Sequence, residues 1–187
     1  MIKAGSIDKG MYLLYKGEPY FVAEREFVNP GKGSAFVRLK LKHVKTGLVL
    51  RETIKTNDSV EEANIEERRA QYLYSDGTSF HFMDNETYEQ FEIPMEGHEE
   101  KGHYLKEGEV YDLVFWNGAP LDVKLPPKMV LVVTEAPEAL RGDTVSNVTK
   151  TVTCETGLQV KVPIFIKEGE KILVNTETGE YVERVNT

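Results

Sequence analysis

The 187-residue sequence predicts an all-β fold made of three small barrels. Three observations predict it: short alternating strands are separated by turns about every ten residues, one hairpin pattern occurs twice, and two stretches break the alternation. The breaks are the acidic stretch 57–67 and Pro126-Pro127, which cannot pair in a central strand and makes a stiff joint. We therefore expect domains at residues 1–64, 65–127 and 128–187.

The first segment has the pattern of a small barrel, with strands expected at 11–15, 20–28, 35–45 and 48–56. We expect Leu48, Leu50 and Ile54 to share one face of the last strand. The strand before it alternates strictly, so that one set of side chains reaches the core and the other faces outward. The core set is Ala35, Val37, Leu39 and Leu41, and the outward set, with three cations in a row, is Phe36, Arg38, Lys40 and Lys42.

A repeated hairpin indicates that the second and third segments share one fold. Lys106-Glu107-Gly108-Glu109 begins a strand through Trp116, and Asn117-Gly118, the strongest short hairpin signal, turns it back. Lys167-Glu168-Gly169-Glu170 begins a second such strand, which Thr178-Gly179 turns back. The simplest explanation is two five-stranded barrels of about sixty residues each.

The other strands of these two segments follow from short apolar or alternating runs. A charged irregular stretch at 97–107 separates two of them, and a long loop at 135–150 lies in the third segment. Loops of that length inside a compact domain are usually functional or disordered. The strands are expected at 68–74, 79–83, 87–93, 120–125, 129–134, 158–166, with Val160, Val162, Ile164 and Ile166 in alternation, and 180–185.

Two aromatic pairs stand out in the second segment. Tyr72 and Tyr74 are two residues apart, as are Phe80 and Phe82, so each pair is expected to share a strand face. Exposed pairs of this kind stack bases in single-strand-binding barrels. Because residues 61–127 carry a net charge of −11, which repels a phosphate backbone, we expect these rings to fill the core instead.

The loop at 29–34 places one lysine, Lys32, between Gly31 and Gly33 and behind Pro30. Proline fixes its own φ, while the glycines adopt conformations that other residues avoid. No acidic residue lies between Glu26 and Glu52 in the sequence, so we expect the ammonium group to be displayed at the end of the cationic row. An ordinary exposed hairpin tip is the alternative.

Charge is divided unevenly along the chain. The net charge of −8 hides a net +5 in residues 1–60, whereas residues 128–187 carry −2. A basic face on an acidic body can bind a polyanion locally, because counterions are released only at the contact. A merely solvated cationic strand is the alternative.

Several classes of protein are disfavoured. No apolar run approaches the ~20 residues of a membrane span, and the N-terminus lacks the apolar region of a secretory signal. The single Cys154 cannot form an internal disulfide, so we expect a cytoplasmic protein with this residue buried. Among the four histidines only His98 and His103 lie close in sequence, and no cysteine accompanies them, so we expect no metal site and no cofactor.

Catalytic motifs are equally lacking. Lys32 is not a phosphate-loop lysine, because a glycine follows it and no helix is expected after the loop. A Schiff-base lysine needs an apolar pocket, which two glycines and a cationic strip do not provide. We therefore expect a protein that is not an enzyme.

Several motifs together make the whole chain resemble the bacterial translation elongation factor P family. Two positions depart from the family pattern: Asn29 and Val152 stand where lysine and alanine are common. The motifs are Pro30-Gly31-Lys32-Gly33-Ser34-Ala35-Phe36-Val37-Arg38, Tyr72-Leu73-Tyr74 with Asp76-Gly77, Phe82-Met83-Asp84, Gly142-Asp143-Thr144, and Lys150 through Gly157 to Val162-Pro163 and Gly169.

The resemblance implies an SH3-like barrel followed by two OB-fold barrels in an elongated, tRNA-like arrangement. It implies a monomer that binds the 70S ribosome between the P and E sites and stimulates peptide-bond formation at consecutive prolines. Lys32, modified by a dedicated enzyme, would position the CCA end of the peptidyl-tRNA, and the ribosome would do the chemistry.

Further residues follow from the same resemblance. The expected contacts with peptidyl-tRNA are Pro30, Gly31, Lys32, Gly33, Arg38, Lys40 and Lys42. The expected contacts with the ribosome and the E-site codon are Gly142, Asp143, Thr144, Tyr181 and Arg184. Two alternatives remain: a general single-stranded nucleic-acid-binding protein that uses its OB-fold barrels, and a lysine-dependent enzyme.

Overall fold

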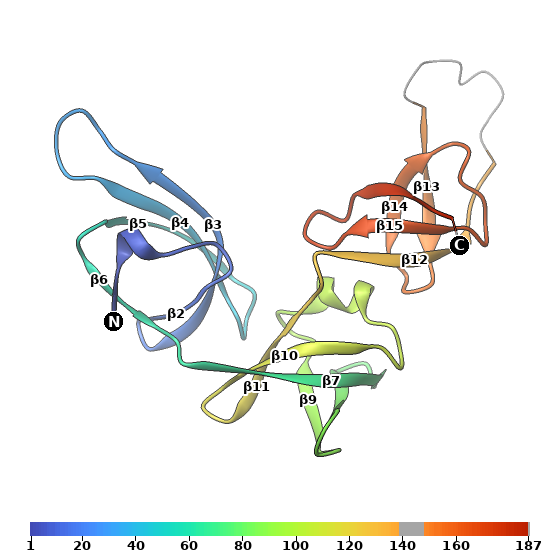
Figure 1. Ribbon diagram of the computed structural model, residues 1–187, viewed down its shortest axis with the longest axis horizontal. Helices are drawn as coiled ribbons and strands as arrows, with labels where there is room; N and C mark the ends of the chain where they lie inside the picture. Colours follow the sequence, from blue (N-terminus) through green and yellow to red (C-terminus); the bar gives the residue numbers. More distant parts are fainter. Residues whose placement is uncertain (139–147, 187) are drawn as a thin grey trace.

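The structure, a computed structural model, describes residues 1–138 and 148–186. Its regular elements in these residues are sixteen strands and two short 3-10 helices, so the predicted all-β class is confirmed. The strands form three curled sheets, one after another along the chain (Figure 1). No helix in the described residues is both long enough and apolar enough to cross a membrane.

The first barrel is a six-stranded sheet in the order β1-β6-β2-β3-β4-β5. Its core contains Val37, Leu39 and Leu41 of the predicted inward set, together with Ile7, Leu13 and Val22 from neighbouring elements. Ala35, the fourth member of that set, precedes β4 and is only half-buried. In chain order the elements are β1 (Ile2–Lys3), η1 (Ala4–Ser6), β2 (Tyr12–Tyr15), β3 (Glu18–Val28), β4 (Phe36–His43), β5 (Val49–Lys55) and β6 (Ser59–Glu62).

Two further details of this barrel differ from the sequence-based expectation. Residues 59–62, inside the stretch expected to be an acidic boundary, form strand β6, which pairs with both β1 and β2 and closes the barrel. Leu48 lies before β5 and is exposed, whereas Leu50 and Ile54 pack against the core. The β4–β5 turn therefore ends one residue later than the hydrophobic pattern suggests.

The second barrel is a five-stranded sheet in the order β11-β10-β7-β8-β9. Strand β7 is long and already begins at Ile65, and the irregular stretch contains a single 3-10 helix. The elements are β7 (Ile65–Ser75), β8 (Ser79–Asp84), β9 (Gln90–Pro94), η2 (Glu99–Tyr104), β10 (Val110–Trp116) and β11 (Ala119–Lys124).

The third barrel has the corresponding order, β14-β13-β12-β15-β16. Residues 149–154 form β13, so the expected loop at 135–150 gives way to a strand at its last two positions. Ile164 follows the end of β14 and is exposed, unlike Val160, Val162 and Ile166. The elements are β12 (Lys128–Glu135), β13 (Thr149–Cys154), β14 (Gln159–Pro163), β15 (Lys171–Asn175) and β16 (Tyr181–Val185).

The repeated hairpin is a structural repeat. Gly108 and Gly169 have φ values of +87° and +89°, and each donates its amide to the first strand of its own barrel, to Tyr72 O and Val133 O. The two hairpins that follow, β10–β11 and β15–β16, both contain an irregularity in register. The prediction that the second and third segments share one fold is therefore confirmed.

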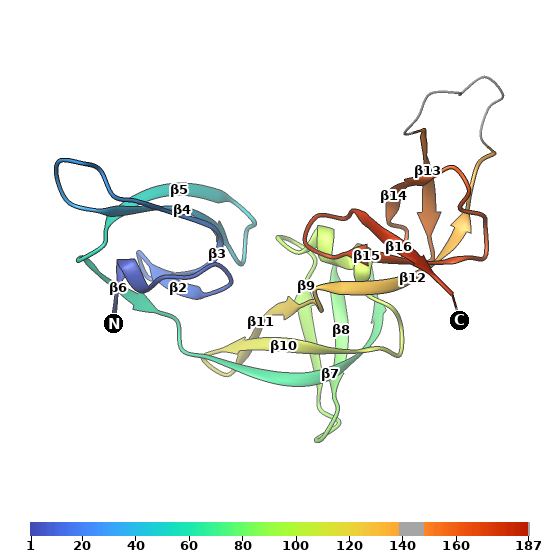
Figure 2. The same ribbon diagram turned by 45° about the horizontal axis from the view of Figure 1, so that its top comes forward.

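The three barrels lie in a bent row, with the second between the other two (Figures 1 and 2). The second and third share one continuous apolar core. The first meets the second through a smaller buried cluster: Tyr12, Val44, Ala63, Val114 and Leu121.

Candidate nucleic-acid interface

The loop between β3 and β4 projects from the first barrel, on the side away from the other two barrels (Figures 1 and 2). Gly33 has a φ of +96°, which requires glycine, and a Cβ added at Gly31 or Gly33 would meet nothing within 4 Å. Lys32 at the tip is exposed and, among the described residues, makes no ion pair. The loop therefore presents its ammonium group to solvent, as the sequence predicts.

The outward set of β4 forms the centre of a cationic sheet face. On β5, Arg51 pairs with Lys40 and Lys55 pairs with Phe36, so both extend this face. The sequence reasoning missed these two residues, although the alternation of 49–55 and the antiparallel register contain the signal. The cationic row, defined here as Arg38, Lys40, Lys42, Arg51 and Lys55, thus runs from the loop toward the second barrel.

Two glutamates on β3 partly neutralise the cationic row. Glu26 lies opposite Arg38, 3.9 Å away, and Glu24 lies opposite Lys40, 3.5 Å away. Both pairs are largely exposed, where an ion pair contributes little and a stronger anion can replace it. Five cations against two carboxylates leave the face net positive.

Lys42 lies at the end of the row that approaches the second barrel. The pKa of Glu99 on η2 is lowered, mainly by backbone hydrogen bonding, and the charges of His98 and Lys42 contribute further. Lys42 is half-buried, whereas Arg38 is exposed. Because Lys40 is half-buried as well, a polyanion on this face would meet Arg38 and Lys32 more directly than Lys40 and Lys42.

The aromatic residues of the second barrel do not form a base-stacking platform. Tyr72, Phe80 and Phe82 are buried, as the sequence predicts, and Phe82 has no exposed surface. Tyr74 differs: an irregularity in the β7–β8 register between Tyr72 and Tyr74 turns it outward, where it is 48% exposed and stacks on His81 at 4.4 Å. The expectation that Tyr72 and Tyr74 share a face is wrong, because the extra residue reverses the side-chain alternation.

The third barrel contributes Tyr181 and Arg184, both on β16. Tyr181 packs partly against the core, and the Arg184 guanidinium lies 5.3 Å from the centre of the Phe165 ring and 3.8 Å from Glu170. Strand β16 belongs to the opposite end of the bent row from the β3–β4 loop (Figure 2). Gly142, Asp143 and Thr144 lie outside the described residues.

Cys154, His98 and His103 lie in different surroundings. Cys154 is buried, as predicted, and burial raises the pKa of its thiol to about 11. His98 is buried beside Asp122, while His103 lies on η2. In the described part of the chain, no three side chains of the metal-binding types gather closely enough to hold an ion.

Comparison with known families decides the relationship. Three family models match in succession: the elongation factor P KOW-like domain over residues 3–60, the elongation factor P OB domain over residues 65–123, and the elongation factor P C-terminal domain over residues 129–184. The chain belongs to the elongation factor P family. The resemblance noted from the sequence is thereby confirmed.

Individual elongation factor P proteins match over the whole chain. The protein from Treponema denticola is 54% identical over 187 residues, and that from Treponema pallidum is 55% identical over 186 residues, with all of both chains covered in each case. The protein from Borrelia duttonii is 51% identical, covering 98% of this chain and 97% of its own. These relatives support a role in translation elongation.

A solved structure also matches. The eukaryotic translation initiation factor 5A from Methanococcus jannaschii aligns with a TM-score of 0.51 at 25% identity. The alignment covers 66% of this elongation factor P family member and 90% of the other chain. A KOW-like barrel and OB-type barrels agree with the fold class predicted from the sequence.

Proposed function

We propose that this protein binds the ribosome between the P and E sites and stimulates peptide-bond formation at consecutive prolines. In this proposal Lys32 positions the CCA end of the peptidyl-tRNA, and the ribosome performs the chemistry. Proline is a constrained secondary amine and reacts poorly, so holding its partner in a productive pose lowers the barrier through orientation alone.

The observation that carries the proposal is the placement of Lys32. The lysine lies at the tip of a projecting hairpin, is exposed, and has no carboxylate partner among the described residues. Behind it the cationic row continues along β4 and β5 for contact with a phosphate backbone. Pro30, Gly31 and Gly33 shape the tip, and Arg38, Lys40 and Lys42 are the proposed contacts along the tRNA.

The remaining contacts are proposed for the third barrel. Tyr181 and Arg184 on β16 would contact the ribosome, as would Gly142, Asp143 and Thr144 near the E-site codon. Since β16 and the Lys32 loop belong to opposite ends of the bent row, the two groups would contact separate parts of the ribosomal complex (Figure 2).

The proposal includes several properties of the protein as a whole. We propose that a lysine-modifying enzyme acts on Lys32, whose exposure makes it accessible. The protein would act as a cytoplasmic monomer, with domains at 1–64, 65–127 and 128–187. These limits fall between the three sheets.

The proposal is tested by Lys32→Ala in a translation system that reports on a Pro-Pro-Pro message and on a proline-free message. Loss of an exposed loop side chain changes the free energy of unfolding by no more than about 0.5 kcal/mol, so the variant folds normally. We expect stimulation of the Pro-Pro-Pro message to be lost and the proline-free yield to be unchanged. Lys16→Gln, at an exposed turn of the same barrel, is the control and retains full stimulation.

Equal Pro-Pro-Pro yields with the parent protein and Lys32→Ala would contradict the proposal. Mass analysis of the protein purified from its native host tests the proposed modification of Lys32 separately. We expect added mass on the peptide that contains Lys32.

A further inference from the structure

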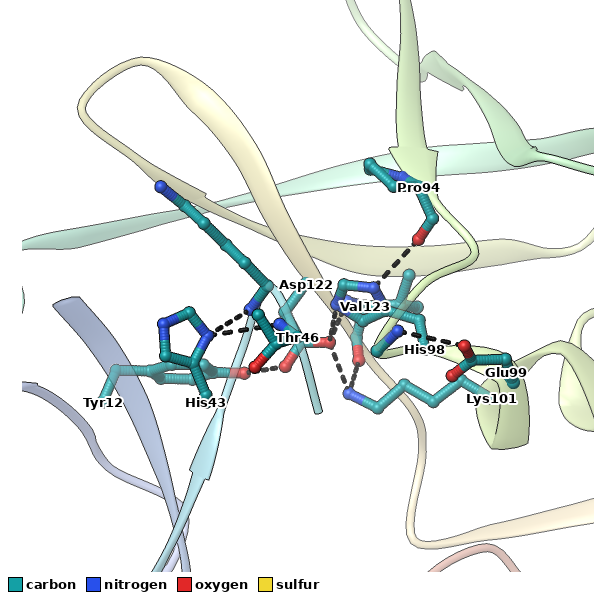
Figure 3. Close-up of polar contacts among 11 residues, drawn as sticks. Tyr12, His43, Thr46, Pro94, His98, Glu99, Lys101, Asp122 and Val123 are labelled. Carbon is teal, nitrogen blue, oxygen red and sulfur yellow. Dashed lines mark hydrogen bonds and ion pairs between the residues drawn. The ribbon is translucent and has the colours of Figure 1, made fainter. Parts of the chain in front are cut away.

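A buried carboxylate lies between the first and second barrels. Asp122 is on β11, opposite Val114, on the face of the second barrel that the first barrel covers, and only 4% of it is exposed. Its Oδ2 accepts a hydrogen bond of 2.7 Å from the hydroxyl of Tyr12 on β2 of the first barrel (Figure 3). One hydrogen bond thus crosses the joint between two buried side chains.

The other oxygen of Asp122 is held by the second barrel itself. Oδ1 accepts hydrogen bonds from Lys101 Nζ at 2.6 Å and from the Val123 amide at 2.8 Å, and His98 Nε2 lies 3.4 Å away (Figure 3). His98 is itself fixed, because its Nδ1 lies 3.0 Å from the carbonyl oxygen of Pro94. The carboxylate is therefore a rigid part of the second barrel that faces the first.

The protonation states of the two groups suit this bond. Burial alone would raise the pKa of Asp122, but the charges of Lys101 and His98 hold it below the usual value. Burial and the Asp122 charge raise the pKa of Tyr12 far above its ordinary value. The phenol therefore keeps its proton and donates it to an ionised acceptor, and hydrogen bonds of this kind are stronger than those between neutral groups.

The joint also contains contacts of other kinds: Lys45 Nζ lies 5.4 Å from the centre of the Trp116 ring, and Gly47 and Gly97 approach each other closely. Its buried cluster consists mainly of small or aliphatic side chains, and the chain crosses between the barrels only at Ala63-Asn64, between β6 and β7. Apolar burial favours contact but no particular angle. A second polar contact of the first barrel, Lys9 with Glu177 in the third, is exposed on both sides and is expected to constrain the angle little.

Small rotations at this joint are magnified at Lys32. The eight residues of β4 span roughly 26 Å, so a rotation of about 10° at its joint end displaces the tip by roughly 4 to 5 Å. Catalysis by positioning is sensitive to displacements of about 1 Å.

We propose that the Tyr12–Asp122 hydrogen bond is a positioning contact that fixes the angle of the first barrel on the second and thereby the place of Lys32. Its effect on orientation follows from the geometry alone, whereas its effect on translation rests on the proposed function. Tyr12 and Asp122 are positioning residues, since neither lies at the tip.

The orientation is tested with Tyr12→Phe, which keeps the ring and removes the hydroxyl. Nitroxide labels at Lys16→Cys in the first barrel and Glu89→Cys in the second report the interbarrel distance by pulsed electron resonance, and Cys154 is too buried to react. Losing a hydrogen bond to a charged group shifts an equilibrium by roughly 10- to 100-fold, so we expect a clearly broader distance distribution. Glu177→Gln, which removes only the exposed pair, is the control and keeps the narrow distribution. An unchanged distribution in Tyr12→Phe would overturn the proposal.

The consequence for Lys32 is tested by titrating each variant into the Pro-Pro-Pro translation system. Tyr12→Phe is expected to lower the maximal stimulation several-fold, with little change in the concentration for half-maximal effect, because every proposed ribosome contact is intact. A broadened distribution with unchanged maximal stimulation would refute the positioning role while leaving the proposed function intact. If Lys32→Ala also stimulates normally, the proposed function fails, and the distance measurement still decides the orientation.

Discussion

Gly97 and Gly47 bring the first two barrels together backbone to backbone. A Cβ added at Gly97 would lie 3.2 Å from the Gly47 amide nitrogen and 3.0 Å from the Lys45 carbonyl oxygen. Gly97 also has a φ of +83°, which disfavours any other residue. The turn between β4 and β5 therefore fits against the loop that precedes η2, close to the residues shown in Figure 3.

Gly97→Ala is expected to destabilise the protein more than a matched glycine substitution. Gly77→Ala is the control: Gly77 has a φ of +91°, but its added Cβ would meet nothing within 4 Å. Both variants incur the left-handed backbone cost of about 1–2 kcal/mol. Gly97→Ala adds a clash with backbone atoms, for which we expect at least about 1 kcal/mol more. Urea unfolding measures the free energy of unfolding of both variants. Equal losses would show that the backbone at the joint moves apart without a further energetic cost.

Acid should weaken the β7–β8 turn through Asp76. The pKa of this carboxyl is lowered from 3.8, first by the hydrogen bond with His81 and then by those from Thr78 and Ser79. A lowered folded-state pKa stabilises the fold above the unfolded value, and this contribution is lost as the pH falls below about 4. In Asp76→Asn, which cannot titrate, we expect a smaller loss of stability between about pH 5 and pH 2 than in the parent. Urea unfolding of both proteins at both pH values measures this loss. Equal losses of stability in the parent and in Asp76→Asn would mean that another carboxyl group determines the sensitivity to acid.

The cationic row should determine how binding to the ribosomal complex depends on salt. Each phosphate contact that is lost reduces the slope of log affinity against log salt by about one. Arg51→Gln and Lys40→Gln are therefore expected to weaken binding and flatten the slope. Glu24→Gln, which frees Lys40 from its partner, is the counterpart and should strengthen binding at low salt. Binding titrations at several salt concentrations measure these slopes, and identical slopes in all variants would exclude the row from the contact.

Local patterns in the sequence predicted most of the fold. The alternation of 36–43 identified both the buried and the outward faces of β4, because a period of two has one interpretation when one face is apolar. Asn117-Gly118 marked the β10–β11 turn, where both residues adopt positive φ as this turn requires. The placement of Lys32 followed in the same way, from the glycines beside it and the absence of nearby acids.

The features that the sequence reasoning missed depend on distant partners. Strand β6 is short and polar, and only its pairing with β1 and β2 makes it a strand. The outward turn of Tyr74 needs one extra residue in β7 relative to β8, which no local pattern reveals. Asp122 lies between Leu121 and Val123 in the sequence, and its partner Tyr12 comes from another barrel. Reasoning from local periodicity does not extend to such contacts.

The duplicated hairpin allows one copy to be compared with the other within the same chain. The segments 106–125 and 167–185 share one strand order and have two glycines of positive φ each, Gly108 and Gly118 in the first and Gly169 and Gly179 in the second. The first segment also packs against the KOW-like barrel through Val114 and Leu121. The first copy of the hairpin has thus become part of the joint between two barrels. Replacing residues 106–125 with residues 167–185, or the reverse, would show which side chains of the hairpin serve its own fold and which serve the contact with the first barrel.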